Sequence, residues 1–214
     1  MRYTEELRAA AGDSWQAIVE HPFTDALAAG TLDPVLMKRY LIQDHRFIDD
    51  FVVLLASAVA HAPTLADRIP GCQFLALITG TENTYFERSF VALGVTDTER
   101  TQTPDAIVTA DFKTLMRTAA ASGSYARMLA VLTVAEWSYL SWADRVKQHR
   151  PANFWHAEWI DLHTGAYFES VVEWLRGQLD AIGPALPADS DRQVREDFRQ
   201  AVELERAFFD HAWR

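Results

Sequence analysis

Cysteine is almost absent from this sequence of 214 residues, which contains a single thiol, Cys72. One cysteine cannot form an internal disulfide or build a thiolate metal cluster, so the fold must be held together by packing. This cysteine usage agrees with a reducing compartment, and we expect a cytoplasmic protein. We predict that Cys72 is a small, buried and inert hydrophobic residue.

Basic charge is scarce as well. The chain has 20 lysines and arginines against 30 aspartates and glutamates, a formal net charge of −10. Such a surface repels nucleic-acid phosphates and anionic lipid, so we expect no nucleic-acid partner. No apolar run approaches the roughly 20 residues of a membrane span, and we expect no membrane partner. The N-terminus has the charged residues Glu5 and Glu6 where a signal peptide needs an apolar stretch.

Glycine-rich loops are missing too, since the nine glycines are dispersed along the chain. The sequence therefore predicts no phosphate-binding loop and no nucleotide cofactor. Hydrophobic residues are plentiful at 49% and aromatic residues at 12%. This composition is typical of a folded globular protein. No composition shift or linker divides the chain, and we expect one domain over residues 1–214.

Helical periodicity dominates, and no stretch alternates apolar and polar residues as a strand would. Asp33 and Pro34 provide the N-cap and first turn of a long helix, and Gly30 and Gly94 end the helices before them. The fold class predicted is all-α, with an unusually apolar helix from Tyr125 at its centre. The helices are expected over residues 5–19, 23–29, 34–61, 71–93, 105–121, 125–148, 158–179 and from 190 or 191 to 213, with a polar loop at 96–104.

Three acidic residues fall where apolar core residues are expected. Asp44 shares a helix face with Tyr40 and Phe47, Glu136 lies in the most apolar helix, and Glu205 lies among apolar residues of the last helix. A buried carboxylate is costly unless it is paired or used. Three such acids with aromatic neighbours indicate an enclosed pocket for a flat polar ligand.

Two other functions remain open on these residues. An acid beside aromatic residues is often a boundary residue whose carboxylate reaches solvent. A non-enzymatic helical regulator or binding protein predicts that the three acids are scattered over the surface. A di-iron oxidase on a helical bundle needs acids and histidines at helical spacing, but none of the seven histidines has an acid three or four residues before it. We therefore predict no metal ligands.

Several motifs resemble the TenA/thiaminase II family over nearly the whole chain. They are His21-Pro22-Phe23 with Gly30-Thr31-Leu32, Tyr40-Leu41-Ile42-Gln43-Asp44 followed by Phe47, Glu136-Trp137-Ser138-Tyr139, and Glu203-Leu204-Glu205 leading into Phe208-Phe209. The resemblance implies a haem-oxygenase-like helical bundle that hydrolyses breakdown products of the thiamin pyrimidine in thiamin salvage. It also implies a homo-oligomer, a dimer or a tetramer, and no cofactor.

The resemblance is to the branch of that family that lacks the active-site cysteine. In the cysteine branch a nucleophilic cysteine stands two residues before the tryptophan, whereas this sequence has Ala135 there and Glu136 beside it. The implied chemistry is independent of cysteine. Phe112 and His163 stand where the family often has tyrosines, and both are expected to contact substrate, as is Phe208.

The resemblance further implies roles for five residues. The substrate is 4-amino-5-aminomethyl-2-methylpyrimidine or its formyl derivative, and the product is the hydroxymethylpyrimidine. Asp44 is expected to bind the aminopyrimidine edge, and Phe47 to stack on the ring. Tyr139 is expected to donate a hydrogen bond. Glu205 is expected to act as general acid and base, with Glu136 as its partner, so that one of the two carboxyl groups holds a proton at neutral pH.

Overall fold

The computed structural model describes residues 1–214 and contains only helices, which confirms the all-α prediction. The elements are α1 (Tyr3–Ala11), α2 (Asp13–Val19), α3 (Pro22–Ala28), α4 (Pro34–His61), α5 (Leu65–Leu77), the π-helical turn η1 (Ile78–Glu82), α6 (Asn83–Ala92), α7 (Asp97–Gln102), α8 (Ile107–Ala121), α9 (Tyr125–Val146), α10 (Phe154–Leu162), α11 (Gly165–Ile182), the 3-10 turn η2 (Gly183–Ala185) and α12 (Ala188–Trp213).

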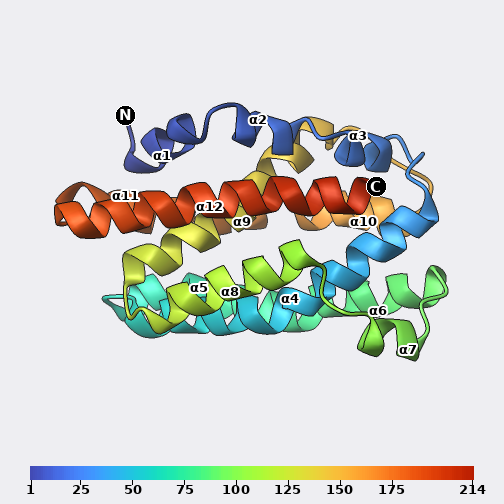
Figure 1. Cartoon of the computed structure of the whole chain (residues 1–214), viewed down its shortest axis with the longest axis horizontal. Helices are drawn as coiled ribbons and strands as arrows, with labels where there is room; N and C mark the ends of the chain where they lie inside the picture. The colour runs from blue at the N-terminus through green and yellow to red at the C-terminus, as the bar shows by residue number, and fades with distance from the viewer.

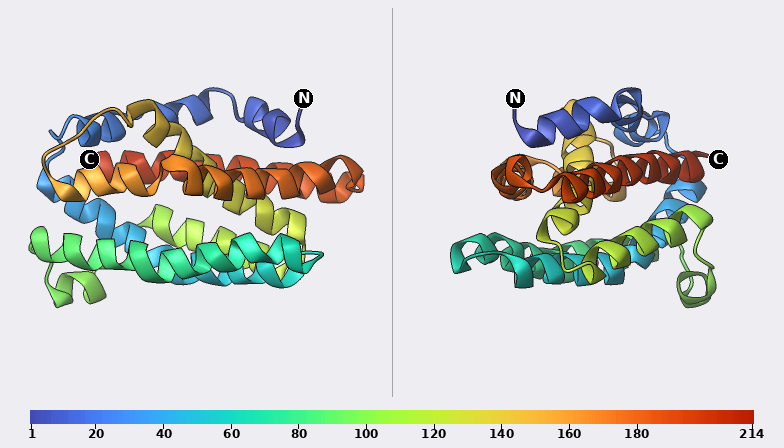
Figure 2. Two further views of the ribbon diagram at one scale, coloured as in Figure 1. Left: turned by 180° about the vertical axis from the view of Figure 1, so that it is seen from behind. Right: turned by 60° about the vertical axis from the view of Figure 1, so that its left-hand side comes forward.

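The helices form three layers, which Figure 1 shows from top to bottom. The short helices α1 to α3 form the top layer, α10 to α12 the middle layer, and α4 to α8 the bottom layer. Helix α9 runs obliquely from the bottom layer to the top, and both views in Figure 2 agree with this arrangement. One hydrophobic cluster of 52 buried residues joins the layers. None of the helices is both long and apolar enough to cross a membrane.

Helix α9 is the central element, as the sequence predicts. It begins where Ser124 caps the first turn, with its hydroxyl accepting from the Arg127 amide at 3.4 Å. Gly123 allows the turn before it because its φ of 66° is unfavourable for other residues. Helix α9 packs against α12, α11, α4, α2 and α8. A helix that is apolar on more than one face can be buried in this way, and Trp142 is completely inaccessible.

Helix α4 has both ends where the sequence predicts them, at Pro34 and His61. The Asp33 carboxylate accepts a hydrogen bond from the Val35 amide at 2.8 Å, and Pro34 occupies the first helical position. This helix carries Asp44 and Phe47 toward the centre of the molecule.

Two expected helices are divided. The segment 5–19 breaks at Gly12, whose φ of 52° ends α1 before α2 begins. The segment 158–179 is interrupted after His163, where Gly165 with a φ of 82° starts α11 in a new direction, and α10 begins earlier, at Phe154. In each case a glycine in the left-handed region redirects the chain.

The segment 71–93 also differs from the prediction. Helix α5 begins at Leu65, before Pro70, because Thr64 and Asp67 exchange capping-box hydrogen bonds of 3.2 Å each. The π-helical turn η1 then separates α5 from α6.

Two further predictions in this part of the chain are wrong. The polar segment 96–104 contains α7, which starts at a second capping box between Thr96 and Glu99. Cys72 is exposed on α5 and is not a core residue, because it lies next to the buried residue Gly71 but on the solvent side of the helix.

Candidate active site

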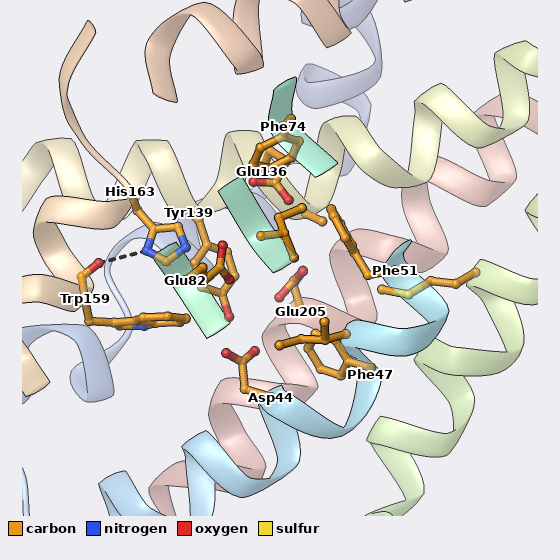
Figure 3. A pocket seen from close by; sticks show the side chains of 14 residues that line it. Asp44, Phe47, Phe51, Phe74, Glu82, Glu136, Tyr139, Trp159, His163 and Glu205 are labelled. Atoms are coloured by element: carbon orange, nitrogen blue, oxygen red, sulfur yellow. Dashed lines mark hydrogen bonds between the residues drawn. The ribbon is translucent and has the colours of Figure 1, made fainter. Parts of the chain in front are cut away.

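A pocket with a volume of about 60 Å³ lies among α4, α5, η1, α8, α9, α10 and α12. This is larger than the roughly 10–15 Å³ that one water molecule requires. Four carboxylates line it: Asp44 from α4, Glu82 from η1, Glu136 from α9 and Glu205 from α12 (Figure 3). No lysine or arginine lines the pocket to pair with them. The site is therefore an acidic cavity with room for a ligand that donates hydrogen bonds or carries positive charge.

Burial distinguishes the four acids. Asp44, Glu136 and Glu205 are only 6%, 9% and 2% exposed, whereas Glu82 is half-buried. Glu205 Oε2 is enclosed without a hydrogen-bond partner. This arrangement is the opposite of the scattered surface acids that a non-enzymatic regulator would predict. An unpaired polar atom at this depth indicates a group kept for binding or chemistry, since burial without a partner is costly.

The environment favours the protonated form of these acids. Burial raises the pKa of Asp44 well above its usual range, and the charge of Glu82 raises it further. Burial raises the pKa of Glu136 in the same way, with added effects of Glu82 and Asp44. For Glu205, burial is again the first cause of a raised pKa, followed by the charges of Asp44 and Glu136. At neutral pH these three carboxyl groups can hold protons.

Glu82 differs because burial raises its pKa only to about 7. It is therefore the pocket acid that ionises near neutral pH. The site thus contains proton donors and a proton acceptor at the same pH, which acid–base catalysis requires.

A chain of hydrogen bonds orients Tyr139. The Trp159 indole N–H donates to the Tyr40 hydroxyl at 3.2 Å, and the hydroxyls of Tyr40 and Tyr139 are 2.7 Å apart. Tyr40 is completely buried and has no other partner for its hydrogen, so its O–H donates to Tyr139. The O–H of Tyr139 is then free to donate into the pocket, which it lines.

His163 lies at the end of α10 and presents an acceptor. Its Nδ1 is 2.8 Å from the Trp159 carbonyl oxygen, which can only accept, so Nδ1 carries the hydrogen. Burial lowers the pKa of His163 to about 4, so the ring is neutral at pH 7. Nε2 is consequently a hydrogen-bond acceptor in a residue that lines the pocket.

The structure places the predicted site residues in two groups. Asp44, Phe47, Glu136, Tyr139, His163 and Glu205 all line the pocket. Phe112 and Phe208 do not: they are buried and pack against Phe47, with ring centroids 5.8 and 5.3 Å from its ring. Their contact with substrate stays a prediction, and in the structure both rings pack against Phe47, which lines the cavity. They support the ring that faces it.

Ala135 lines the pocket beside Glu136, so the position next to the acids carries a methyl group. The only thiol, Cys72, is not part of the lining. No group of three or more histidine, cysteine or acidic side chains is arranged as a metal site.

Glu82 is the pocket acid that the sequence analysis missed. It has the same signal as the other acids, since Tyr85 and Phe86 follow it by three and four residues. Its neighbours Gly80, Thr81 and Asn83 are small or polar, and such a run is typical of a solvent-exposed surface. The sequence therefore does not single out Glu82 as a pocket residue.

Comparison with known proteins agrees with this geometry. The model of the TENA/THI-4/PQQC family matches residues 8–214. The chain belongs to this family. A relative from Bacillus subtilis, named aminopyrimidine aminohydrolase, is 23% identical over 220 residues, covering 100% of this chain and 91% of the relative. Another of the same name, from Helicobacter pylori, is 23% identical over 215 residues and covers 100% and 99%.

Solved structures of the family share the fold. The TenA homologue from P. horikoshii superposes with a TM-score of 0.86 at 22% identity, covering 100% of this chain and 99% of that one. A protein from Silicibacter described as a TenA family transcription regulator gives a TM-score of 0.86 at 23% identity, with 98% and 96% covered. The helical bundle implied by the sequence resemblance is confirmed.

Proposed function

We propose that this protein is an aminopyrimidine aminohydrolase that works without a cysteine nucleophile. It replaces the amino group of 4-amino-5-aminomethyl-2-methylpyrimidine, or the formylamino group of its derivative, with a hydroxyl group. The observation that carries the proposal is the set of carboxyl groups around one pocket, beside Ala135 and without a cationic partner. The relatives named aminopyrimidine aminohydrolase support the same reaction class.

The pocket suits an aminopyrimidine. Asp44 accepts from or donates to the edge of the ring according to its protonation, and Phe47 offers a ring face for stacking. Tyr139 supplies a donor and His163 Nε2 an acceptor, and their rings are neighbours with centroids 4.8 Å apart, so this part of the pocket wall suits a ligand that both accepts and donates hydrogen bonds. Buried polar groups of this kind select ligands that satisfy them, because an unsatisfied group costs free energy.

Glu205 supplies the proton for the departing amine. The carbon–nitrogen bond breaks as the nitrogen takes this proton, and the oxygen of water forms the new bond to the methylene carbon. Glu205, now ionised, then takes a proton from that water. Glu136 is its partner in this transfer. The raised pKa of Glu205, caused first by burial, supports its role as the acid at neutral pH.

The test is to incubate the purified protein with the aminomethyl pyrimidine, the formylaminomethyl pyrimidine and thiamin, and to follow products by mass. We expect the hydroxymethylpyrimidine from at least one of the first two substrates. Absence of product from both pyrimidines would overturn the proposal. A regulatory protein that binds DNA would instead need a basic surface, which a net charge of −10 does not favour.

A further inference from the structure

We propose that Glu82 is the general base of this pocket, the residue that takes the proton from the attacking water while Glu205 protonates the departing amine. The inference rests on the proposed function and deepens it. Of the two proton transfers assigned to Glu205 above, Glu205 keeps the one to the amine and Glu82 takes the one from water. Glu82 lies at the wall of the pocket formed by η1, at the junction of α5 and α6.

The π-helical turn places Glu82 between the cavity and solvent. Ile78 and Glu82, at the two ends of η1, line the pocket, whereas the residues between them, 79–81, are exposed. The protein wall is therefore one turn thick at this point. Glu82 is half-buried while the other three acids are buried. Burial raises the pKa of Glu82 only to about 7, and π turns often occur at functional positions.

Glu82 and Glu205 enter the pocket from different layers. Glu82 belongs to the bottom layer and Glu205 to α12 in the middle layer (Figure 1), and Figure 3 shows both side chains directed toward the same space. The charge of Glu82 raises the pKa of Asp44 and of Glu136, and the charges of these two residues raise the pKa of Glu205. A displacement by water needs an acid at the leaving group and a base at the water, with the reacting carbon between them. Hydrolases that use two separated carboxyl groups meet this requirement.

The titratable groups that face Glu82 provide no positive charge to pair with its carboxylate. They are Asp44 from α4, Tyr85 from α6, Glu136 and Tyr139 from α9, His163 from the end of α10 and Glu205 from α12. None is a lysine or arginine, and His163 is neutral at pH 7 because burial lowers its pKa to about 4. The three other acids are enclosed and favour their protonated forms. Glu82, with a pKa raised by burial to about 7, is the group able to accept a proton at working pH.

The reaction balances with these two groups. The water oxygen bonds to the methylene carbon, and the carbon–nitrogen bond breaks with its electron pair leaving on nitrogen. The nitrogen takes the proton of Glu205, and the proton of the water goes to Glu82. The products are the hydroxymethylpyrimidine and ammonia. Transfer of one proton from Glu82 to Glu205 through solvent restores both groups.

The test compares pH profiles of kcat/KM for the wild type, Glu82→Gln and Glu82→Asp on the aminomethyl pyrimidine. For the wild type we expect activity to rise with pH through a midpoint near 7, the pKa of Glu82. Glu82→Gln should lose roughly a hundredfold in kcat and lose this rise, since the amide cannot accept the proton. Glu82→Asp should retain the rise at reduced rate. Glu87→Gln is the matched control, because Glu87 is exposed on α6 and pairs with Arg100 at 2.8 Å.

Persistence of the same midpoint in Glu82→Gln, with the fold intact by circular dichroism, would overturn the assignment. A carboxyl-carbon NMR titration of wild-type protein labelled in glutamate gives a second measurement that needs no turnover. A Glu82 carboxyl that titrates near the ordinary glutamate value of about 4.3 would also overturn it. Failure of the proposed function is a different result, because the wild type would then release no product from either pyrimidine.

Discussion

Glu205 is the residue whose proton the proposed reaction consumes. Glu205→Gln keeps the shape of the side chain and removes that proton, so kcat should fall by roughly a hundredfold or more while substrate still binds. Turnover measured by product mass and binding measured by calorimetry would separate the two effects. Glu203→Gln on the exposed side of α12 is the matched control. Near-normal turnover in a folded Glu205→Gln protein would refute the role of Glu205.

Glu136 should act with Glu205 and not independently of it. Glu136→Gln is expected to lower kcat, but the double variant should lose less than the product of the two single losses, because both groups serve one proton transfer. Kinetics of the two single variants and the double variant measure this coupling. Fully multiplicative losses would show that the two carboxyl groups serve separate steps.

The exposed thiol makes the cysteine-independent mechanism directly testable. Cys72 is exposed on α5 and outside the pocket lining, and Ala135 occupies the position beside Glu136. We expect an alkylating reagent to modify one thiol of the native protein and to leave turnover unchanged. Mass spectrometry would confirm the modification, and Cys72→Ser is the control. Loss of activity on alkylation that Cys72→Ser reproduces would contradict the mechanism.

Among the elements, α5 packs against its neighbours with almost no spare room at Gly71. A Cβ added there would lie 2.5 Å from Val59 Cγ2 on α4 and 2.9 Å from the Trp174 ring on α11. Gly71→Ala should therefore destabilise the protein by about 1–3 kcal/mol, since a packed core resists added volume. Gly177 is the matched control because it lies inside α11 with open space around its Cα. Gly177→Ala should stabilise by roughly 0.5–1 kcal/mol.

Urea unfolding followed by circular dichroism measures both effects. Equal changes for the two alanine variants would show that the contacts of Gly71 relax without cost and that α5 is not held closely between α4 and α11.

The elements also show what the sequence can and cannot predict. Both ends of α4 follow from local signals, because Asp33 with Pro34 starts it and Pro63 stops it. The break at Gly12 and the turn η1 have no such signal. A glycine can sit inside a helix or end it, and a π turn depends on how α5 and α6 pack.

The site likewise contains residues that the sequence can predict and residues that it cannot. Asp44, Glu136 and Glu205 stand out because each is a charge within an apolar pattern. Which of Phe47, Phe112 and Phe208 lines the cavity depends on how three helices pack, and spacing along one helix cannot show it. Glu82 depends on the same packing, since η1 sets which of its residues face inward.

For the molecule as a whole, the buried histidines make stability depend on pH. His156 is 1% exposed, and neither ring nitrogen has a hydrogen-bond partner. Burial lowers the pKa of His156 to about 4, from an ordinary value of 6.5. Between these values the unfolded chain binds a proton that the folded protein refuses, so the free energy of unfolding falls as pH decreases. Above pH 6.5 this loss is absent.

The buried carboxyl groups act in the opposite direction, because their raised pKa values let the folded protein keep protons that the unfolded chain has lost.

A variant of His156 separates the contribution of this histidine from that of the carboxyl groups. Between pH 7 and pH 5, wild type should lose about 2 kcal/mol more of its free energy of unfolding than His156→Leu does, as a pKa depressed from 6.5 to about 4 requires. Urea unfolding at both pH values measures the difference between the two proteins. The contributions of His163 and the carboxyl groups are the same in both and cancel. Identical pH dependence in the two proteins would mean that His156 takes up its proton inside the fold, which requires a partner or water beside its ring.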